Sequence, residues 1–181
     1  TGEGGMIVRN NMSYARRAKE LRSHGIVKEN NKLLDKSKGD WYYEQQYLGF
    51  NFRLSDLQAA LGLSQLKRLD HFVYDRNILF ERYKSMIHSS PLRLLDSGST
   101  HGNTSSLHLA ILMLPQLNCC QYNKVFSLMR ENKIGVQLHY LPVHLQPFYR
   151  NLGFKEGDFP NSEKYSHTAL SIPLFVGLLE S

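Results

Sequence analysis

The chain has 181 residues, of which 41% are hydrophobic, and it carries a formal net charge of +6 with a pI of about 9.3. This length and composition permit a buried core and exclude a disordered chain. The basic residues are scattered among acidic ones, and their densest stretch, residues 28–38, is short. Because a nucleic-acid reader shows a concentrated basic face or a known module, we expect no nucleic-acid partner.

The two cysteines, Cys119 and Cys120, are adjacent in the chain. Adjacent residues have poor geometry for a mutual disulfide, and the pair lacks the spacing of a zinc site. They are typical of reduced thiols in a cytoplasmic protein. No apolar run approaches the roughly 20 residues that cross a bilayer, and the start of the chain does not resemble a signal peptide. We therefore expect a soluble, cytoplasmic protein with no membrane partner.

The first predicted elements are a strand and a helix. The chain starts at Thr1 rather than at a methionine, inside a glycine-rich turn, so we expect it to be the later part of a longer protein. Residues 5–9 have the apolar character of a strand. Asn11 or Ser13 can cap a helix after it, and Gly25 stands in a position that ends helices. A strand, a turn and a helix in this order are typical of an α/β layer.

A polar stretch and a long helical region follow. Residues 28–46 predict a long loop. Ser55 and Gln58 have the spacing of a capping box, which predicts that a helix starts there. Its first turns are apolar on almost every side, so we expect them to be buried. A stripe at three- and four-residue spacing then continues, as one long helix or as a helix broken once.

The second half alternates strands and helices. Residues 89–106 predict a linker or an exposed hairpin, and the apolar run at 107–114 is typical of a buried strand. Helical spacing at residues 122–129 predicts a helix, with Gly135 just after its end. We further expect a strand at 136–140 and a last helix at 161–170, which together make a small α/β sandwich.

Two polar side chains precede the predicted helix start at Ser55. Asn51 and Arg53 lie just before a helix N-terminus, where backbone N–H groups and the helix dipole favour an anion. A phosphate or a carboxylate is therefore a candidate ligand. The alternative is that both side chains only satisfy loop carbonyl groups.

A second group of candidate residues flanks Pro142. His139, Tyr140 and His144 lie in this stiff segment, where polar and aromatic groups could face a sugar or a uracil ring together. The alternative is a packed aromatic loop. We expect no metal here, because no third ligand at suitable spacing accompanies the two histidines.

Four motifs spread over the chain resemble those of one enzyme family. They are residues 1–5 (TGEGG), 21–26 (LRSHGI), 49–62 (GFNFRLSDLQAALG) and 139–149 (HYLPVHLQPFY). Together they are similar to the motifs of the DegT/DnrJ/EryC1/StrS sugar aminotransferases, which are pyridoxal-phosphate (PLP) enzymes of the aspartate-aminotransferase fold. The resemblance implies an α/β chain that is the C-terminal part of a fold-type I PLP-dependent transferase.

This resemblance also implies a division of the chain. Residues 1–54 would be a remnant of the large PLP-binding domain, residues 55–88 a long connecting helix, and residues 89–181 the small C-terminal α/β domain. In the family, the Schiff-base lysine lies a few residues before the Thr-Gly-Glu-Gly motif, which falls upstream of Thr1. The resemblance therefore implies no catalytic residue in this chain, and we expect the chain to be inactive alone.

The implied reaction moves an amino group from L-glutamate to a UDP-linked 4-keto-6-deoxy sugar, with PLP as cofactor, in a homodimer. By resemblance, Asn51 reaches the cofactor phosphate across the dimer, Arg53 meets a carboxylate or a substrate phosphate, and His139, Tyr140 and His144 contribute to the nucleotide-sugar site. Residues 42–46, 61–70, 139–149 and 157–160 resemble the pseudaminic-acid branch of the family. Two alternatives stay open, a non-catalytic binding or dimerisation module and a relative that dehydrates its substrate.

Overall fold

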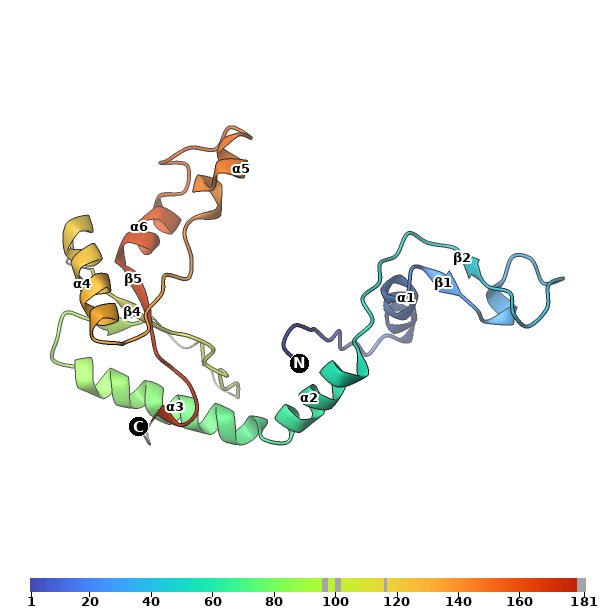
Figure 1. Ribbon diagram of the computed structural model, residues 1–181, viewed down its shortest axis with the longest axis horizontal. Helices are drawn as coiled ribbons and strands as arrows, with labels where there is room; N and C mark the ends of the chain where they lie inside the picture. The colour runs from blue at the N-terminus through green and yellow to red at the C-terminus, as the bar shows by residue number, and fades with distance from the viewer. Residues whose placement is uncertain (96–97, 100–101, 116, 179–181) are drawn as a thin grey trace. The chain divides into compact units, whose positions relative to one another are not determined.

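The structure is a computed structural model that describes residues 1–95, 98–99, 102–115 and 117–178. The chain divides into two compact units, Thr1–Lys67 and Arg68–Ser181, each of which has its own elements (Figure 1). The predicted mixture of helices and strands is present in both units. The first unit carries a two-stranded sheet and the second a three-stranded sheet.

The first unit begins with helix α1 (Met12–Arg22). The side chain of Asn11 caps it by accepting a hydrogen bond of 2.9 Å from the backbone N–H of Ser13, so Asn11 rather than Ser13 is the cap. Gly25 follows the end of α1 with φ of +71°, as predicted for a residue that ends a helix. A β-carbon at Gly25 would collide with the carbonyl group of Tyr47, so this position has room only for glycine.

The strands of the first unit differ from the prediction. Strand β1 (Ile26–Val27) pairs antiparallel with β2 (Glu44–Gln45), and the connection between them contains the 3₁₀ helix η1 (Asn30–Lys32), so residues 28–46 are not one uninterrupted loop. The predicted strand at residues 5–9 is wrong, because this segment has no strand assignment. Apolar character alone does not make a strand, since the backbone N–H and C=O groups also need a neighbouring strand to pair with.

The predicted capping box at Ser55 is confirmed. Helix α2 (Asp56–Leu66) begins after Ser55, whose side chain and Gln58 exchange the two hydrogen bonds of that motif. The next helix, α3 (Leu69–Ile87), starts the second unit, so of the two alternatives the broken helix is correct. The expectation that the first turns of α2 are buried is wrong, since α2 has no buried residue and Leu57 is 85% exposed.

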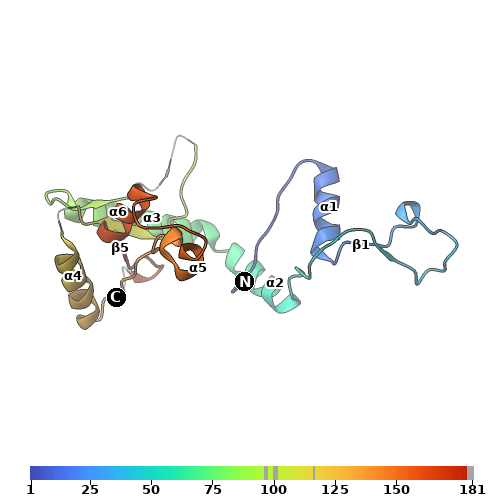
Figure 2. The same ribbon diagram turned by 90° about the horizontal axis from the view of Figure 1, so that it is seen from above.

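The second unit is built on a three-stranded antiparallel sheet with the order β3-β4-β5. Figure 2 shows the unit from above, with α6 running directly into β5. The longest ladder pairs β4 with β5, from Ala110 opposite Ile172 to Met113 opposite Ala169. The elements after α3 are β3 (Arg93–Leu94), β4 (Ala110–Met113), α4 (Cys119–Glu131), η2 (Val143–Leu145), α5 (Pro147–Arg150), α6 (Pro160–Thr168) and β5 (Ala169–Ile172).

Two apolar clusters join helices to this sheet. Leu79 and Phe80 of α3 pack with Ala110 of β4, and Tyr122 of α4 packs with Leu170 of β5. Ile172 contacts both clusters, so β5 connects the two parts of the core. Burial of such apolar side chains supplies most of the favourable free energy of folding. The hydroxyl of Tyr122 is also satisfied, because it donates to the carbonyl of Ala169 at 2.8 Å.

Several predicted boundaries in the second unit move. The buried strand predicted at 107–114 is the shorter β4, and the strand predicted at 136–140 is reduced to one bridge between Gln137 and Ser171. The last predicted helix is two residues too long, because Ala169 and Leu170 belong to β5. Lys133, with φ of +62°, takes the left-handed position after α4 instead of Gly135. Part of the region predicted as a linker forms β3.

The N-terminal cap of α4 gives a test of this architecture. The side chain of Asn118 accepts from the backbone N–H of Gln121 at 2.9 Å, and the side chain of Gln121 accepts from the backbone N–H of Asn118 at 2.9 Å. Replacing Asn118 by alanine should lower the free energy of unfolding by about 1 kcal/mol, the usual value for a lost cap. Urea unfolding followed by circular dichroism measures it. Asn118→Ser, which keeps a capping oxygen, is the matched control, and equal stability of both variants would contradict the assigned cap.

Candidate functional site

The segment around Asn51 lies against the end of α1. The backbone N–H groups of Phe50 and Phe52 donate to the carbonyls of Leu21 and Arg22, each at 2.9 Å. The N–H of His24 donates to the carbonyl of Phe50 at 2.9 Å. These bonds fix the backbone on both sides of Asn51, which itself forms a bridge with Ser23. The position of Asn51 is therefore set by backbone pairing rather than by its side chain.

Gly49 makes this close approach possible. A β-carbon at Gly49 would lie 2.7 Å from the carbonyl oxygen of Leu21, a distance that real β-carbons essentially never show. Any other residue at Gly49 would push the segment away from α1. The pairing that positions Asn51 consequently depends on this glycine.

Asn51 and Arg53, which lie just before the N-terminus of α2, contact each other. The Nε–H of Arg53 donates to the side-chain oxygen of Asn51 at 3.0 Å, and both residues are exposed. This contact directs the amide oxygen toward Arg53 and involves neither the NH₂ group of Asn51 nor the terminal guanidinium nitrogens. The two side chains thus present N–H donors and one positive charge, which is the chemistry that binds a phosphate or a carboxylate.

The segment around Tyr140 is held in the second unit. His139 is anchored at both its side chain and its backbone, because its Nδ1 shares a hydrogen bond of 2.8 Å with the hydroxyl of Ser171, and the hydroxyl of Tyr165 donates to its carbonyl at 2.9 Å. Burial raises the pKa of Tyr165 above its ordinary value, so this donor is retained into more alkaline solution than a free phenol would allow. The ring of His139 meets the ring of Tyr140 edge to face, with centroids 4.7 Å apart.

His144 faces the interior of the second unit. It is 7% exposed, its Nε2 lies 2.8 Å from Oε1 of Glu163, and its ring lies 4.8 Å from that of Phe159. The hydrogen bond from His144, together with the backbone N–H groups of Gly157 and Phe159, lowers the pKa of Glu163. Because the ionised carboxylate only accepts, Nε2 of His144 is the donor.

Between these two anchored histidines the chain is exposed. Tyr140 is 70% exposed, and Leu141 and Val143 are also exposed, whereas Pro142 is buried. Large apolar side chains that stay in water while their neighbours are fixed are a common feature of binding surfaces. Of the predicted residues, Tyr140 can therefore meet a ligand directly, while Nε2 of His144 is already engaged by Glu163.

Three residues of this arrangement were not predicted from the sequence. Glu163, Tyr165 and Ser171 hold the segment, yet nothing in their spacing points to residues 139–144. An acid in the first turn after Pro160 indicates only a helix start, which is the ordinary meaning of that pattern. Their role becomes visible only when α6 and β5 are placed beside η2 and the segment before it.

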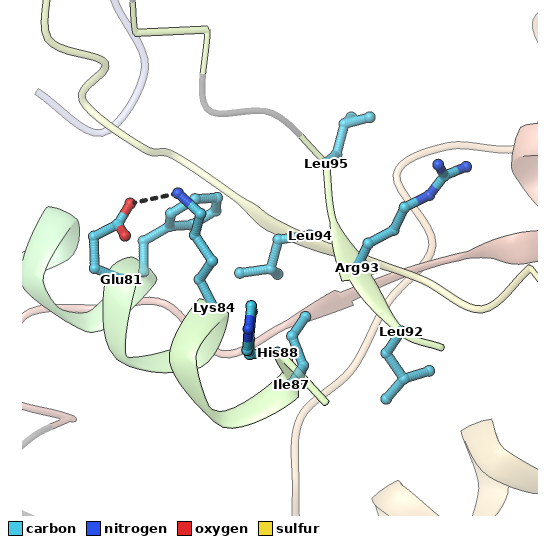
Figure 3. A pocket seen from close by; sticks show the side chains of 9 residues that line it. Glu81, Lys84, Ile87, His88, Leu92, Arg93, Leu94 and Leu95 are labelled. Carbon is cyan, nitrogen blue, oxygen red and sulfur yellow. Dashed lines mark hydrogen bonds and ion pairs between the residues drawn. The ribbon is translucent and has the colours of Figure 1, made fainter. Parts of the chain in front are cut away.

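A cavity of about 410 Å³ lies between α3 and β3, away from these residues (Figure 3). Its lining combines apolar side chains, such as Phe80 and Leu94, with Lys84 and His88. The amino group of Lys84 is paired with Glu81 at 3.3 Å. None of the residues that the sequence predicted as a site lines this cavity.

The described residues form neither a candidate metal site nor a candidate membrane span. Within residues 1–95, 98–99, 102–115 and 117–178, no group of three or more His, Cys, Asp or Glu side chains is placed to hold a metal ion. No helix in the same ranges is both long and apolar enough to cross a bilayer.

The chain is similar to curated proteins along nearly all of its length. It is 35% identical over 178 residues to the spore coat polysaccharide biosynthesis protein SpsC of Bacillus subtilis, covering 97% of this chain and 45% of that protein. It is also 35% identical over 178 residues to the UDP-4-amino-4,6-dideoxy-N-acetyl-beta-L-altrosamine transaminase of Campylobacter jejuni, covering 96% of this chain and 43% of that one. The chain thus spans about half the length of the curated relatives that it matches.

A solved structure agrees with this similarity. Spr1654 from Streptococcus pneumoniae, in its PMP-form, superposes with a TM-score of 0.81 at 25% identity, covering 96% of this chain and 43% of that one. The chain therefore has part of the α/β fold of PLP-dependent sugar aminotransferases. The model of the DegT/DnrJ/EryC1/StrS aminotransferase family, whose members depend on PLP, matches residues 1–181. The chain belongs to the DegT/DnrJ/EryC1/StrS aminotransferase family.

Proposed function

We propose that the protein containing this chain transfers an amino group from L-glutamate to a UDP-linked 4-keto-6-deoxy sugar, with PLP as cofactor. Membership of the family and the 35% identity to the Campylobacter jejuni transaminase support the reaction class. The same identity favours nucleotide-sugar chemistry of the pseudaminic-acid type for surface glycans. A cytoplasmic location follows from the proposed substrates, since nucleotide sugars are made there.

The observation that carries this proposal is the pair of donors at Asn51 and Arg53. A PLP phosphate needs N–H donors and positive charge, and the pair offers both. The residues present therefore fit the phosphate of the cofactor. In the homodimer that we propose, Asn51 would serve the cofactor of the other subunit, with Arg53 beside it.

PLP, when bound, supplies the electron sink for amino transfer. The contribution of this chain is to hold and orient groups. The amide of Asn51 would hold the cofactor phosphate, and the guanidinium of Arg53 would meet a phosphate of the substrate or the carboxylate of the amino donor. The chain offers Tyr140 as an exposed aromatic ring for the uracil or sugar ring, with the ring of His139 perpendicular to it.

His144 has a different place in this proposal. It was predicted to contact the substrate, but its ring is buried and its Nε2 is engaged by Glu163. We therefore propose that His144 acts on the substrate through the position of the segment that precedes it.

The first test is an activity assay on two proteins. With PLP, L-glutamate and a UDP-linked 4-keto-6-deoxy sugar, a complete protein with the preceding domain should form amino sugar, detected by mass spectrometry. The 181 residues by themselves should form none above a buffer blank, because the family resemblance places the lysine that bonds PLP before residue 1. Turnover by the 181 residues would overturn the second expectation, and no turnover by the complete protein would favour the non-catalytic alternative.

The phosphate role of Asn51 is tested in the complete protein. Asn51→Ala should weaken PLP retention about tenfold to a hundredfold, because a hydrogen bond to a charged group contributes about 1.5 to 3 kcal/mol. Titration of the apoprotein with PLP, followed by absorbance, measures the affinity. Asn30→Ala, which changes another exposed asparagine of the same unit, is the matched control. Unchanged affinity in a folded Asn51→Ala variant would refute the assignment.

The ring role of Tyr140 predicts a selective loss. Tyr140→Ala should lower kcat/KM for the UDP-sugar by about fivefold to a hundredfold, since stacking a base on an aromatic ring contributes about 1 to 3 kcal/mol. The KM for L-glutamate should change little, because the amino donor carries no ring to stack. Tyr140→Phe keeps the ring and should retain most of the activity. Equal losses for both substrates with a large fall in Tm would return Tyr140 to a purely structural role.

A further inference from the structure

The segment 140–143, which is exposed except at Pro142, lies between two histidines that are hydrogen-bonded to the rest of the unit. On one side, His139 is tied to Ser171 of β5 and to Tyr165 of α6. On the other side, His144 in η2 is tied to Glu163 of α6. Both ties lead to the continuous stretch formed by α6 and β5, so one rigid part of the unit holds the segment at both ends.

Of the side chains that hold the segment, Glu163 accepts hydrogen bonds from several groups. Its Oε1 accepts from Nε2 of His144 at 2.8 Å and from the backbone N–H of Gly157 at 2.9 Å, and Oε2 accepts from the same N–H at 3.0 Å. The N–H of Phe159 also donates to Oε1, at 3.3 Å. The side chain is only 13% exposed, so these contacts are largely shielded from water. One carboxylate thus joins η2, the turn before α6, and α6 itself.

Resting on the ring role proposed for Tyr140, we propose that Glu163 is a positioning residue for nucleotide-sugar binding. By fixing His144 it fixes η2, and η2 together with the buried Pro142 leaves few conformations to the residues that lead back to Tyr140. The ring of Tyr140 is then presented in one orientation before the ligand arrives. Ordering it in advance removes a cost that binding would otherwise bear.

The inference separates Glu163 from residues that only stabilise the fold. The carboxylate is hydrogen-bonded to His144 of η2 and to the backbone N–H groups of Gly157 and Phe159 in the turn before α6, whereas the apolar clusters around Phe80 and Tyr122 are built on the sheet and on α3 and α4. Losing the carboxylate should therefore loosen a local segment while the sheet and its clusters persist. The affinity for a ligand that stacks on Tyr140 should fall for the same reason.

The first experiment measures the segment without any ligand. In the 181-residue chain, Glu163→Gln should increase the backbone mobility of Tyr140, Leu141 and Val143 in ¹⁵N relaxation. It should also speed hydrogen exchange at Leu145, whose N–H donates to the carbonyl of Pro142 at 3.0 Å in η2. Glu156→Gln removes an exposed carboxylate from the same turn and is the matched control. Unchanged mobility and exchange in Glu163→Gln would overturn the proposal.

The second experiment adds UDP as the probe. Glu163→Gln should weaken UDP binding about threefold to tenfold, the expected cost of ordering one side chain on binding. If Glu163 acts through Tyr140, the double variant with Tyr140→Ala should bind UDP no worse than Tyr140→Ala alone, because the two changes share one effect. Additive losses in this cycle would overturn the positioning role, since a merely structural effect does not depend on the ring.

Two further outcomes are separated by the variants. If Tyr140→Ala leaves UDP binding unchanged, the proposed ring role has failed, and the relaxation data alone decide whether Glu163 holds the segment. If Tyr140→Ala weakens binding but Glu163→Gln does not, the positioning role has failed. Where Glu163→Gln does not fold, Glu163→Asp keeps the charge and withdraws the carboxylate from His144 by one methylene group. Unchanged mobility of residues 140–143 in Glu163→Asp would then contradict the proposal.

Discussion

The antiparallel pairing of β4 with β5 is the interaction on which the second unit depends. It joins residues that are 56 to 62 positions apart in the chain, and it places β5 where both apolar clusters meet at Ile172. Helix α6 runs directly into β5, so its side chains inherit a fixed position from this ladder. The polar groups that hold His139 and His144 all come from these two elements. Hydrogen bonding at the candidate site is therefore a consequence of sheet register.

The two units position their exposed candidate side chains by the same principle. In the first unit, backbone pairing with the end of α1 holds Asn51, and the absence of a β-carbon at Gly49 permits it. In the second unit, buried hydrogen bonds to Glu163 and Ser171 hold the residues on either side of Tyr140. In both cases the candidate side chain stays exposed: Asn51 is hydrogen-bonded to Arg53, and Tyr140 meets the ring of His139 and is 70% exposed. Such pre-ordering leaves those groups available for binding.

The candidate residues also differ in how their side chains are solvated. Asn51 and Arg53 are polar and exposed, and water satisfies them when no anion is present. Tyr140 exposes a large apolar ring surface, and contact of this surface with water is unfavourable. His144 and Glu163 are a shielded hydrogen-bonded pair, and each needs the other because removing one partner leaves a poorly solvated polar group behind. Substitutions at these three kinds of position are expected to remove different interactions: an anion contact, an aromatic contact and a shielded hydrogen bond.

The sequence by itself determined the family, the mixed helix and strand content and the capping box at Ser55, because these follow from short motifs and local hydrogen bonding. It could not decide whether residues 5–9 form a strand or whether α2 is buried. Both depend on a neighbouring segment to pair or pack with, and apolar character does not show whether one is present. Nor could it assign His144, whose environment is set by Glu163, 19 residues away on another helix. Tertiary structure decided the environment of His144, because only the packing of α6 beside η2 places the Glu163 carboxylate against its ring.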